Sequence, residues 1–342
     1  MGLGKRHTIK LDIKNYLHLI IGDRKIGKTG LIADLAKDIY GDIDKLLIVS
    51  VGKEKAYEAI DNAIYEEPQN WQELMDIVDE LIKNEDKYDF DIVSFDTIDE
   101  IIPMAEEEVM RMHTIAYKET PKSFNSAFGG YGEPRKKLNG LIDELLIKLD
   151  KIKGRRCVML IGHNKVRPIK SKLDIEDYYV VSSNLPFDYF NTFAYKCPII
   201  CNIIEDVNVD DGVLKEKARQ MYFRDNGFVE AGSRFSEMPI KVPYGAKEYH
   251  DAVLSGIKAS IDKNTRDEKQ SKKTFKEPSI ENVKTLDGSI KEVIDKAKSL
   301  QESGISQNDI MEVFNSSGYS NPNNIPEIEI AEKIMVELNK LG

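Results

Sequence analysis

The spacing of apolar residues in the first half of the chain predicts strands that alternate with amphipathic helices. Apolar runs of strand length lie at residues 16–21, 46–51, 90–95 and 157–161. Between these runs apolar residues recur every three or four positions, in the segments after Thr29, Trp71 and Ile98 and in the segment around Leu138–Leu149. This alternation predicts an α/β fold, with a mainly parallel central sheet that helices cover on both faces.

The pattern changes beyond residue 165. Further strands are predicted at residues 198–204 and 220–223, followed by a closing helix at residues 246–261. Residues 262–287 are polar and rich in lysine, as is typical of a linker. Helical spacing then returns and predicts a small helical bundle. The predicted organisation is a main domain over residues 1–261, a linker over 262–287 and a helical module over 288–342.

Composition and charge narrow the class of protein. With 41% apolar and 32% charged residues, the chain has the composition of a folded globular protein. Its net charge of −10 does not favour nucleic acid, so any such binding requires a local basic surface. The three cysteines do not form a disulfide framework, and no apolar run approaches the roughly 20 residues that span a bilayer. We therefore expect a cytoplasmic protein that does not bind membranes.

Residues 22–29, with the sequence GDRKIGKT, match the phosphate-binding motif G-x-x-x-x-G-K-[ST] in full. The loop lies where a predicted strand ends and a predicted helix begins. Glycines let such a loop curl so that its backbone N–H groups face phosphate oxygens, and the following helix adds the positive end of its dipole. We predict that the chain binds ATP through Gly22, Asp23, Arg24, Lys25, Ile26, Gly27, Lys28, Thr29 and Gly30.

Two oxygen ligands for magnesium are predicted beside this loop. The Thr29 hydroxyl is the first, and Lys28 beside it would neutralise the β- and γ-phosphates. The second is Asp96, which directly follows the apolar strand of residues 90–95, as a Walker B carboxylate does. The predicted cofactors are therefore ATP and Mg²⁺.

The residues alone leave open which acid aligns the attacking water. Glu54 follows the second predicted strand closely, whereas Asp99 and Glu100 lie at the start of a predicted helix. For Glu54 the alternative is an exposed charge between two lysines. His163 and Asn164 follow the fourth strand directly, where ligand-contacting side chains collect in a parallel sheet. This polar pair is expected to sense the γ-phosphate.

Several segments, taken in order, resemble the RecA-like ATPases encoded by bacteriophages, a group that includes single-strand annealing recombinases. The segments are the phosphate-binding loop, the strand that ends near Glu54, SFDTIDE at residues 94–100, FGGYG at 128–132, IGHNK at 161–165 and AGSRF at 231–235. The resemblance covers roughly residues 10–260. It implies a RecA-like P-loop NTPase fold, to which the small C-terminal helical module is added.

The resemblance also implies roles for individual residues. By position, Glu54 would be the acid that activates water, and His163 would be the sensor after the fourth strand. Arg234 would be a finger that reaches the ATP of a neighbouring subunit, which implies a ring or a filament in the cytoplasm of a phage host. Arg24 and Lys25 depart from the pattern, because such loops usually carry small residues at these positions.

A basic segment follows the fourth strand and provides a candidate contact with DNA. Four cations lie within eight residues, and two tyrosines follow them: Lys165, Arg167, Lys170, Lys172, Tyr178 and Tyr179. If the segment is a loop that lines the channel of a RecA-like assembly, its cations could follow a phosphate backbone and its tyrosines could stack on bases. The alternative is a solvated loop. The lysine-rich stretch Lys269–Lys276 is a second, weaker candidate.

Two classes of function therefore remain open on the sequence. The first is an oligomeric ATPase that acts on single-stranded DNA in phage recombination, annealing or replication, and the basic segment favours it. The second is an ATP-dependent loader or regulatory switch whose target is another protein, bound through residues 288–342. The acidic net charge and the separate helical module are compatible with this second class.

Overall fold

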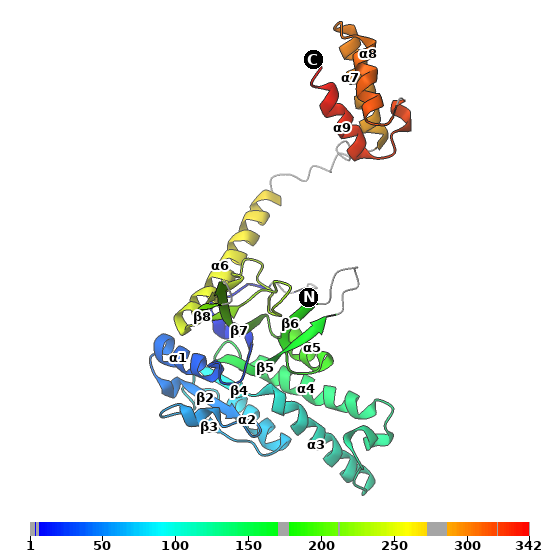
Figure 1. Cartoon of the computed structure of the whole chain (residues 1–342). Helices are drawn as coiled ribbons and strands as arrows, with labels where there is room; N and C mark the ends of the chain where they lie inside the picture. Colours follow the sequence, from blue (N-terminus) through cyan, green and yellow to red (C-terminus); the bar gives the residue numbers. More distant parts are fainter. Residues whose placement is uncertain are drawn as a thin grey trace. The chain divides into compact units, whose positions relative to one another are not determined.

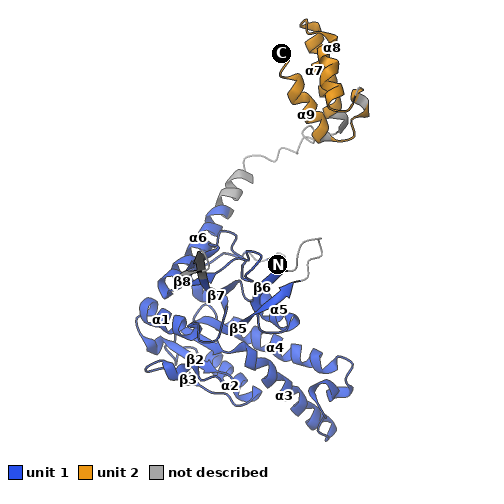
Figure 2. Ribbon diagram, viewed as in Figure 1, with its two compact units in different colours: residues 1–268 blue, residues 269–342 orange. Residues whose placement is uncertain are grey.

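The computed structural model (Figure 1) describes residue 4 and residues 7–169, 178–210, 213–271, 286–319 and 321–341. The chain divides into two units, residues 1–268 and residues 269–342 (Figure 2). Among the helices of the described residues, none combines the length and apolarity needed to cross a membrane.

The first unit is built on one mixed sheet. Its strands run in the spatial order β10-β8-β7-β1-β5-β4-β2-β3, and every pair from β7 to β3 is parallel. The pairs β7–β8 and β8–β10 are antiparallel. The strands are β1 (Leu17–Gly22), β2 (Leu46–Ser50), β3 (Ile64–Glu66), β4 (Ile92–Asp96), β5 (Cys157–Ile169), β7 (Ile199–Asp210), β8 (Val213–Tyr222) and β10 (Lys241–Pro243). The predicted mainly parallel sheet is confirmed.

Helices cover both faces of the sheet, as the sequence predicted. Alternation along the strands provides the two apolar faces: Leu19 and Ile21 of β1 belong to one core cluster, and Ile20 between them belongs to the other. On the first face lie α2 (Trp71–Lys83), α3 (Ile98–Tyr117), α4 (Glu133–Ile152) and α5 (Phe187–Lys196). On the second face lie α1 (Lys28–Tyr40) and α6 (Ala246–Ser271).

The register of the central strands brings the predicted site residues to one edge. Gly22 at the end of β1 lies beside His163 of β5, and Asp96 at the end of β4 lies beside Ser50 of β2. Because these strands are parallel, the loops that follow β1 and β2 leave the sheet on the same side as Asp96 and His163. The carboxyl edge of the sheet therefore carries the candidate site.

The basic segment after the fourth predicted strand is not a loop where the structure describes it. Strand β5 continues to Ile169, and its residues Asn164–Ile169 pair antiparallel with β6 (Tyr178–Ser183). We call these two paired segments the β5–β6 arm. Residues 170–177, which include Lys170 and Lys172, lie outside the described residues. The loop prediction was wrong because the pairing partner of a strand is not visible in its local pattern.

The end of the first unit also differs from the prediction. Helix α6 continues to Ser271, ten residues beyond the expected end of the closing helix, because residues 262–271 contain no glycine or proline and many good helix formers. The rest of the predicted linker, residues 272–285, lies outside the described residues.

The second unit has a core of its own. It contains α7 (Leu286–Glu302), α8 (Gln307–Ser316) and α9 (Ile328–Leu338). Their apolar faces meet in one cluster, which includes Val293, Phe314 and Ile334. The boundaries predicted for the main domain, the linker and the helical module stay predictions.

Candidate nucleotide-binding site

The phosphate-binding loop lies between β1 and α1. It is held by contacts with residues that lie far from it in the sequence. Gly27 precedes α1 with a φ of 108°, a conformation that favours glycine. A Cβ atom at Gly27 would lie 2.6 Å from both Arg219 Nη1 and Tyr244 Oη. These two side chains therefore require a glycine at this position. Lys25 has a φ of 62°, so one of the two atypical residues also takes the left-handed conformation.

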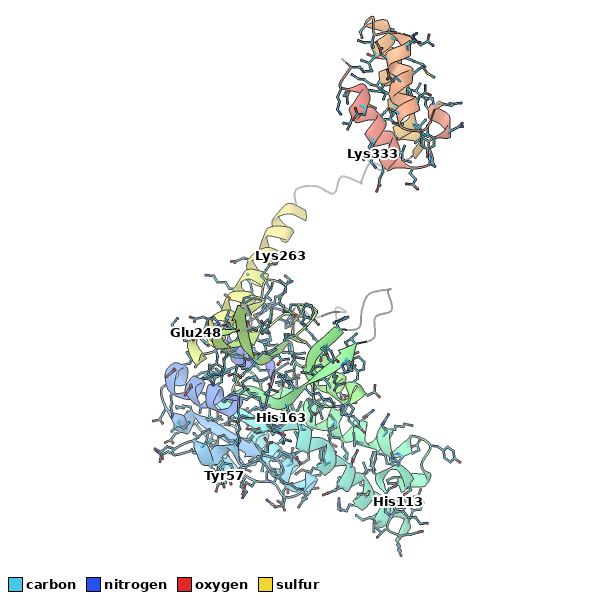
Figure 3. The ribbon with its side chains drawn as sticks, in the orientation of Figure 1. Tyr57, His113, His163, Glu248, Lys263 and Lys333 are labelled. Atoms are coloured by element: carbon cyan, nitrogen blue, oxygen red, sulfur yellow. The ribbon has the colours of Figure 1, made fainter. Side chains whose placement is uncertain are left out.

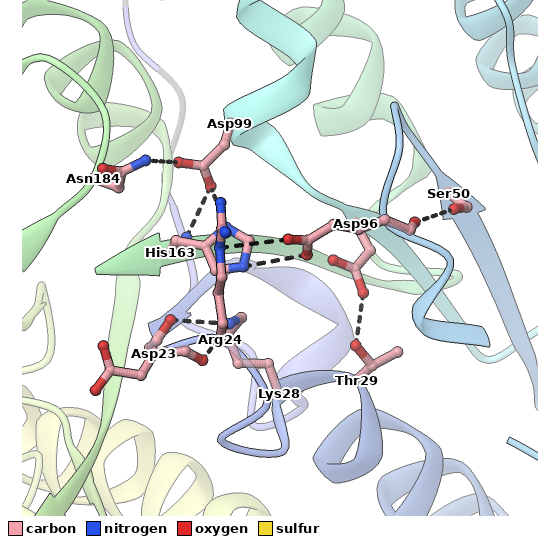
Figure 4. A network of polar contacts seen from close by, with 11 residues as sticks. Asp23, Arg24, Lys28, Thr29, Ser50, Asp96, Asp99, His163 and Asn184 are labelled. Carbon is pink, nitrogen blue, oxygen red and sulfur yellow. Dashed lines mark hydrogen bonds and ion pairs between the residues drawn. The ribbon is translucent and has the colours of Figure 1, made fainter. Parts of the chain in front are cut away.

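Lys28 is the first residue of α1, directly after Gly27, and it is buried. Its Nζ atom donates to the carbonyl oxygens of Gly22 at 2.9 Å and of Asp23 at 2.8 Å (Figure 4). Burial lowers the pKa of Lys28, and the nearby carboxylates of Asp96 and Glu54 oppose that shift. The ammonium group is therefore held in place among carboxylates, where it can meet a phosphate.

Thr29 and Asp96 meet beside this lysine. The Thr29 hydroxyl donates to Asp96 Oδ2 at 2.7 Å, and the Asp96 side chain is buried at the end of β4. Burial raises the pKa of Asp96, whereas the hydrogen bond from Thr29 and the charge of Lys28 lower it. The two residues predicted as metal ligands are thus adjacent, although they lie 67 positions apart in the sequence.

The donor set fits a magnesium ion that is bound together with a triphosphate. Mg²⁺ prefers oxygen ligands, and it usually takes one or two from protein and the rest from phosphates and water. Thr29 and Asp96 offer two such oxygens. The described residues contain no group of three or more His, Cys, Asp and Glu side chains that could hold a metal by itself. Thr29 and Asp96 would hold the ion, which would neutralise phosphate charge when bound.

The three acids considered for water activation have different surroundings. Glu54 lines a cavity of about 810 Å³ together with Lys28, Thr29 and Asp96. Neither Asp99 nor Glu100 is among the residues that line it. Asp99 accepts from the backbone N–H of His163, and Glu100 packs so closely that a Cβ atom at Gly52 would lie 2.5 Å from its side chain. Of the three carboxylates, the geometry therefore favours Glu54 for contact with a water molecule in the cavity.

His163 lies between two carboxylates. Its Nε2 atom is 3.3 Å from Glu54 Oε2, and its Nδ1 atom is 3.3 Å from Asp99 Oδ2. The Asp99 carboxylate also accepts from the backbone N–H of His163 at 2.8 Å and from Asn184 Nδ2 at 3.2 Å (Figure 4). Burial acts to raise the pKa of Asp99, but the hydrogen bonds from His163 outweigh it and the pKa is lowered. Asp99 is therefore an anion, and its carboxylate orients the His163 ring.

The other predicted sensor does not face the cavity. Asn164 is buried, and its Nδ2 atom donates to Asn202 Oδ1 of β7 at 2.9 Å. The Arg24 guanidinium, by contrast, extends from the phosphate-binding loop to within 3.7 Å of Glu54 Oε1. Arg24 thus places a cation next to the favoured acid, a contact that the sequence did not indicate.

Arg234 lies away from the site of its own chain. It follows β9 (Gly232–Ser233), which pairs with the first residues of β7, whereas Gly22 is level with Ile203 of β7. Four residues of strand separate the two levels, roughly 13 Å. The Arg234 side chain is exposed and donates to the carbonyl oxygen of Tyr195. The structure does not bring Arg234 together with the other predicted site residues of the same chain.

Two residues that support the loop were not foreseen. Arg219 of β8 donates from Nη1 to the carbonyl oxygen of Ile26 at 3.0 Å, and its guanidinium lies 3.9 Å from the centre of the Tyr244 ring. Tyr244 donates from its hydroxyl to the carbonyl oxygen of Gly27 at 2.8 Å. Neither residue belongs to a local motif, so no signal in the sequence pointed to them.

Beyond the phosphate-binding loop, the cavity extends along the 3-10 helix η3 (Ala56–Ala59). It is lined there by Lys55, Ala56, Glu58, Ala59 and Ile60, which follow Glu54 directly. The cavity is therefore larger than a phosphate group requires, and it begins at the loop and ends on the segment after β2.

Comparison with known families decides the class of this site. The AAA domain family matches residues 14–235, more than half of the 342 residues. The chain belongs to the AAA domain family. The match includes the phosphate-binding loop, Glu54, Asp96 and His163. As a member of this AAA family the protein is a P-loop ATPase, a class that uses a nucleoside triphosphate and usually Mg²⁺. Among curated proteins, none matches the chain.

Proposed function

We propose that this ATPase acts on single-stranded DNA as a RecA-like oligomer, in the manner of the phage-encoded annealing and recombination proteins that its sequence resembles. One observation carries the proposal. Strand β5 runs without interruption from His163, at the ATP site, into the β5–β6 arm. The same strand thus holds a residue at the candidate site and the basic segment that is our candidate contact with DNA.

The arm has the kinds of side chain that bind single-stranded DNA, although it offers fewer free cations than the sequence indicated. Lys165 is exposed, as is Tyr179, with 68% of its surface accessible. Arg167 does not contribute a free cation, because its Nη2 atom donates to the carbonyl oxygens of Ser183 and Leu185. An exposed lysine and exposed aromatic rings can provide phosphate contact and base stacking, respectively. Tyr178, also exposed, packs edge-on against Phe228 with ring centres 6.2 Å apart.

The base of the arm is joined to the ATP site. Asn184, which directly follows β6, donates from its backbone N–H to the carbonyl oxygen of His163 at 2.7 Å. Its side chain donates to Asp99, which holds the His163 ring. A ligand that moves the arm would therefore displace partners of His163. This connection supports an ATPase whose rate depends on DNA.

Self-association is part of the proposal. Arg234 is exposed, lies at the opposite edge of the sheet from its own phosphate-binding loop, and is expected to reach the ATP of a neighbouring subunit. In an assembly of identical subunits, head-to-tail contact would place one edge of the sheet against the other, as a ring or a filament requires.

Binding of single-stranded DNA at increasing salt tests the proposal. The wild-type protein should bind an oligonucleotide of thymidines, with an affinity that falls as salt rises. Lys165→Ala should weaken binding and reduce the slope of log affinity against log salt by about 0.7. Lys196→Ala, on α5 outside the arm, is the matched control and should leave the slope unchanged. Absence of binding at low salt would contradict the proposal.

A second candidate function rests on the C-terminal unit. Its three helices form a separate apolar core, and Glu329, Glu332 and Glu337 with Lys333 line a cavity of about 520 Å³ on α9. Such an acidic surface could bind a basic segment of a protein partner, as a loader or regulatory switch would. If residues 288–342 bind the partner, deleting them should leave DNA binding intact and abolish partner binding.

A further inference from the structure

Arg24 is a cation at the candidate site that the phosphate-binding motif does not require. It lies inside the loop, at a position where such loops usually carry a small residue. It lines the cavity together with Lys25, Lys28 and Glu54. The loop therefore offers a triphosphate more positive charge than the motif alone would provide, and the surroundings of Arg24 indicate where that charge acts.

The Arg24 guanidinium is held weakly by its neighbour. Its Nε atom lies 3.7 Å from Glu54 Oε1, which is beyond hydrogen-bond distance, and 80% of the Arg24 side chain is exposed (Figure 4). Among the described residues, Glu54 is the carboxylate that Arg24 approaches within 4 Å. Ion pairs as exposed as this one contribute little to stability. The pair can therefore separate when a stronger anion enters the cavity.

The backbone of the loop is fixed on both sides of Arg24. Lys28 Nζ donates to the carbonyl oxygen of Asp23, directly before Arg24, at 2.8 Å. Arg219 donates to the carbonyl oxygen of Ile26, two residues after Arg24, at 3.0 Å. The backbone N–H of Ile26 closes the loop by donating to the carbonyl oxygen of Asp23 at 3.3 Å. The Arg24 side chain can therefore exchange partners while the loop keeps its shape.

Glu54 marks the part of the cavity where the γ-phosphate must lie. A base that activates water lies within hydrogen-bond reach of that water, which in turn lies about 3–3.5 Å from the atom that it attacks. Glu54 is the acid that the geometry favours for this task, and His163 Nε2 is 3.3 Å from its carboxylate. The cavity extends from His163 to η3, the segment that contains Tyr57 (Figure 3). The Arg24 guanidinium thus lies on the γ-phosphate side of this cavity.

A phosphate is a better partner for Arg24 than Glu54 is in the observed geometry. The N–H groups of a guanidinium form a planar fork that matches two phosphate oxygens, and such charge-assisted hydrogen bonds are about twice as strong as neutral ones. Charge on the transferred phosphoryl group is also what arginine stabilises in P-loop NTPases. ADP has no γ-phosphate, so it would leave Arg24 beside Glu54.

We propose that Arg24 is a γ-phosphate contact supplied by the same chain, and that it exchanges Glu54 for this phosphate when ATP binds. The exchange frees Glu54 to accept from water only when a γ-phosphate is present. Arg24 thereby distinguishes ATP from ADP and links water activation to the bound triphosphate. Arg234 differs from it, because Arg234 is expected to reach the ATP of a neighbouring subunit. The inference concerns the ATPase itself and does not depend on the proposed action on DNA.

Binding of two nucleotides tests the contact. The first is an ATP analogue whose β- and γ-phosphorus atoms are joined through nitrogen, and the second is ADP, both with Mg²⁺. Arg24→Ala should weaken binding of the analogue about tenfold and change the Kd for ADP by less than about twofold. Arg24→Lys keeps the charge and should recover part of the lost affinity. Equal weakening of both nucleotides would overturn the inference.

Lys53→Ala is the matched control for these measurements. It removes an exposed cation directly before Glu54 that is not among the residues lining the cavity, so both Kd values should stay as in the wild type. Since the Arg24 side chain is also exposed, the melting temperature of Arg24→Ala should match that of the wild type. A weakening by Lys53→Ala as large as that by Arg24→Ala would reduce the effect to general charge and overturn the inference.

The same titrations in a Glu54→Gln background separate contact with phosphate from positioning of Glu54. Arg24→Ala should weaken binding of the analogue about tenfold there too, because the phosphate contact does not need the carboxylate. If the loss appears only while Glu54 is intact, or if kcat falls with no change in either Kd, Arg24 acts only by positioning Glu54, and the inference is overturned.

Hydrolysis in the absence of DNA tests whether Arg24 acts within its own chain. The kcat of Arg24→Ala should fall about a hundredfold or more, since the loss of one preorganised donor at a developing charge has an effect of that size. Added Lys28→Ala protein keeps Arg24 but lacks the phosphate-binding lysine, and it should not restore the rate. Restoration would show that Arg24 reaches a neighbouring site and would overturn the assignment. Because DNA is absent from every measurement, failure here leaves the proposed function standing.

Discussion

The carboxylate of Asp99 contacts His163 twice, through the backbone N–H at 2.8 Å and the Nδ1 atom at 3.3 Å. Glu54 lies 3.3 Å from the Nε2 atom on the other side of the same ring. A doubly protonated ring can donate to both carboxylates, whereas a neutral ring can donate to only one of them. The contacts with Asp99 therefore fix how the ring faces Glu54, the favoured catalytic acid.

The first prediction concerns this positioning role. Asp99→Asn removes the negative charge next to Nδ1 while it keeps the shape of the side chain. We expect kcat for ATP hydrolysis to fall by about tenfold to a hundredfold, with a much smaller change in the Kd for ATP. The pH profile of kcat should shift as well, because the variant lacks the carboxylate that contacts the His163 ring.

Glu100→Gln is the matched control for this variant. Glu100 is adjacent in sequence, but the carboxylates that contact the His163 ring among the described residues are those of Glu54 and Asp99, so kcat should stay within about twofold of wild type. An Asp99→Asn protein with wild-type kcat and an unchanged pH profile would show that Asp99 has no role in positioning the histidine.

The second prediction concerns the support of the phosphate-binding loop. Tyr244→Phe removes the hydrogen bond to the carbonyl oxygen of Gly27, and Arg219→Ala removes the hydrogen bond to Ile26 together with the stacking on Tyr244. Because a single hydrogen bond contributes about 1 kcal/mol, we expect Tyr244→Phe to weaken nucleotide binding about fivefold. The Kd for ATP measured by calorimetry checks this.

A second tyrosine provides the comparison. The hydroxyl of Tyr222 donates to Asp206, which lies outside the cavity, so Tyr222→Phe should leave the Kd for ATP unchanged. If Tyr244→Phe binds ATP as tightly as Tyr222→Phe does, the contact with Gly27 does not shape the loop.

The third prediction concerns stability against acid. His18 is fully buried in β1, where Nε2 donates to the carbonyl oxygen of Ile13 and Nδ1 accepts from the Tyr249 hydroxyl. Burial lowers its pKa from 6.5 to about 4. The unfolded chain therefore takes up a proton at a higher pH than the folded chain does. The contribution of His18 to stability is complete above pH 6.5 and is lost progressively as the pH falls toward 4.

Denaturant titration between pH 7 and pH 4 measures this effect. Within that window, the free energy of unfolding should decrease by up to about 1.4 kcal/mol per pH unit from this group. His18→Gln should be less stable at pH 7 but should lose this part of the pH dependence. His250→Gln, which changes a partly exposed side chain of α6, should keep this pH dependence. An unchanged slope in His18→Gln would refute the assignment.

The fourth prediction concerns the division of the chain. Because the helices of the second unit have their own core, a protein of residues 1–271 should unfold cooperatively and should keep the ATPase rate of the full chain within about twofold. Circular dichroism during thermal unfolding and a steady-state ATPase assay check both points. A broad, non-cooperative transition would show that the first unit needs the residues removed.

Short-range patterns predicted the framework of the fold. The buried runs of β1, β2 and β4 and the helical spacing of α1 and α2 are visible in the sequence, because each segment buries one continuous apolar surface. The phosphate-binding loop was equally clear, since its motif is local. Its neighbour Asp96 could be named in advance because parallel strands bring their carboxyl ends to one edge.

Contacts between distant segments were not predictable in the same way. The β5–β6 arm mixes lysine, valine and proline along one strand, a pattern that resembles a loop until its partner strand is known. Arg219 and Tyr244 reach the phosphate-binding loop across 193 and 217 residues of sequence. The position of Asp99 against His163 depends on the packing of α3 beside β5, which no local pattern encodes.

Steady-state ATP hydrolysis with and without a single-stranded oligonucleotide tests the central claim most directly. We predict that DNA raises the wild-type rate severalfold, that Lys165→Ala with Tyr179→Ala keeps the basal rate but loses the stimulation, and that Lys28→Ala hydrolyses no ATP under either condition. An identical wild-type rate with and without DNA would contradict a role on single strands, and undiminished hydrolysis by Lys28→Ala would contradict the site itself.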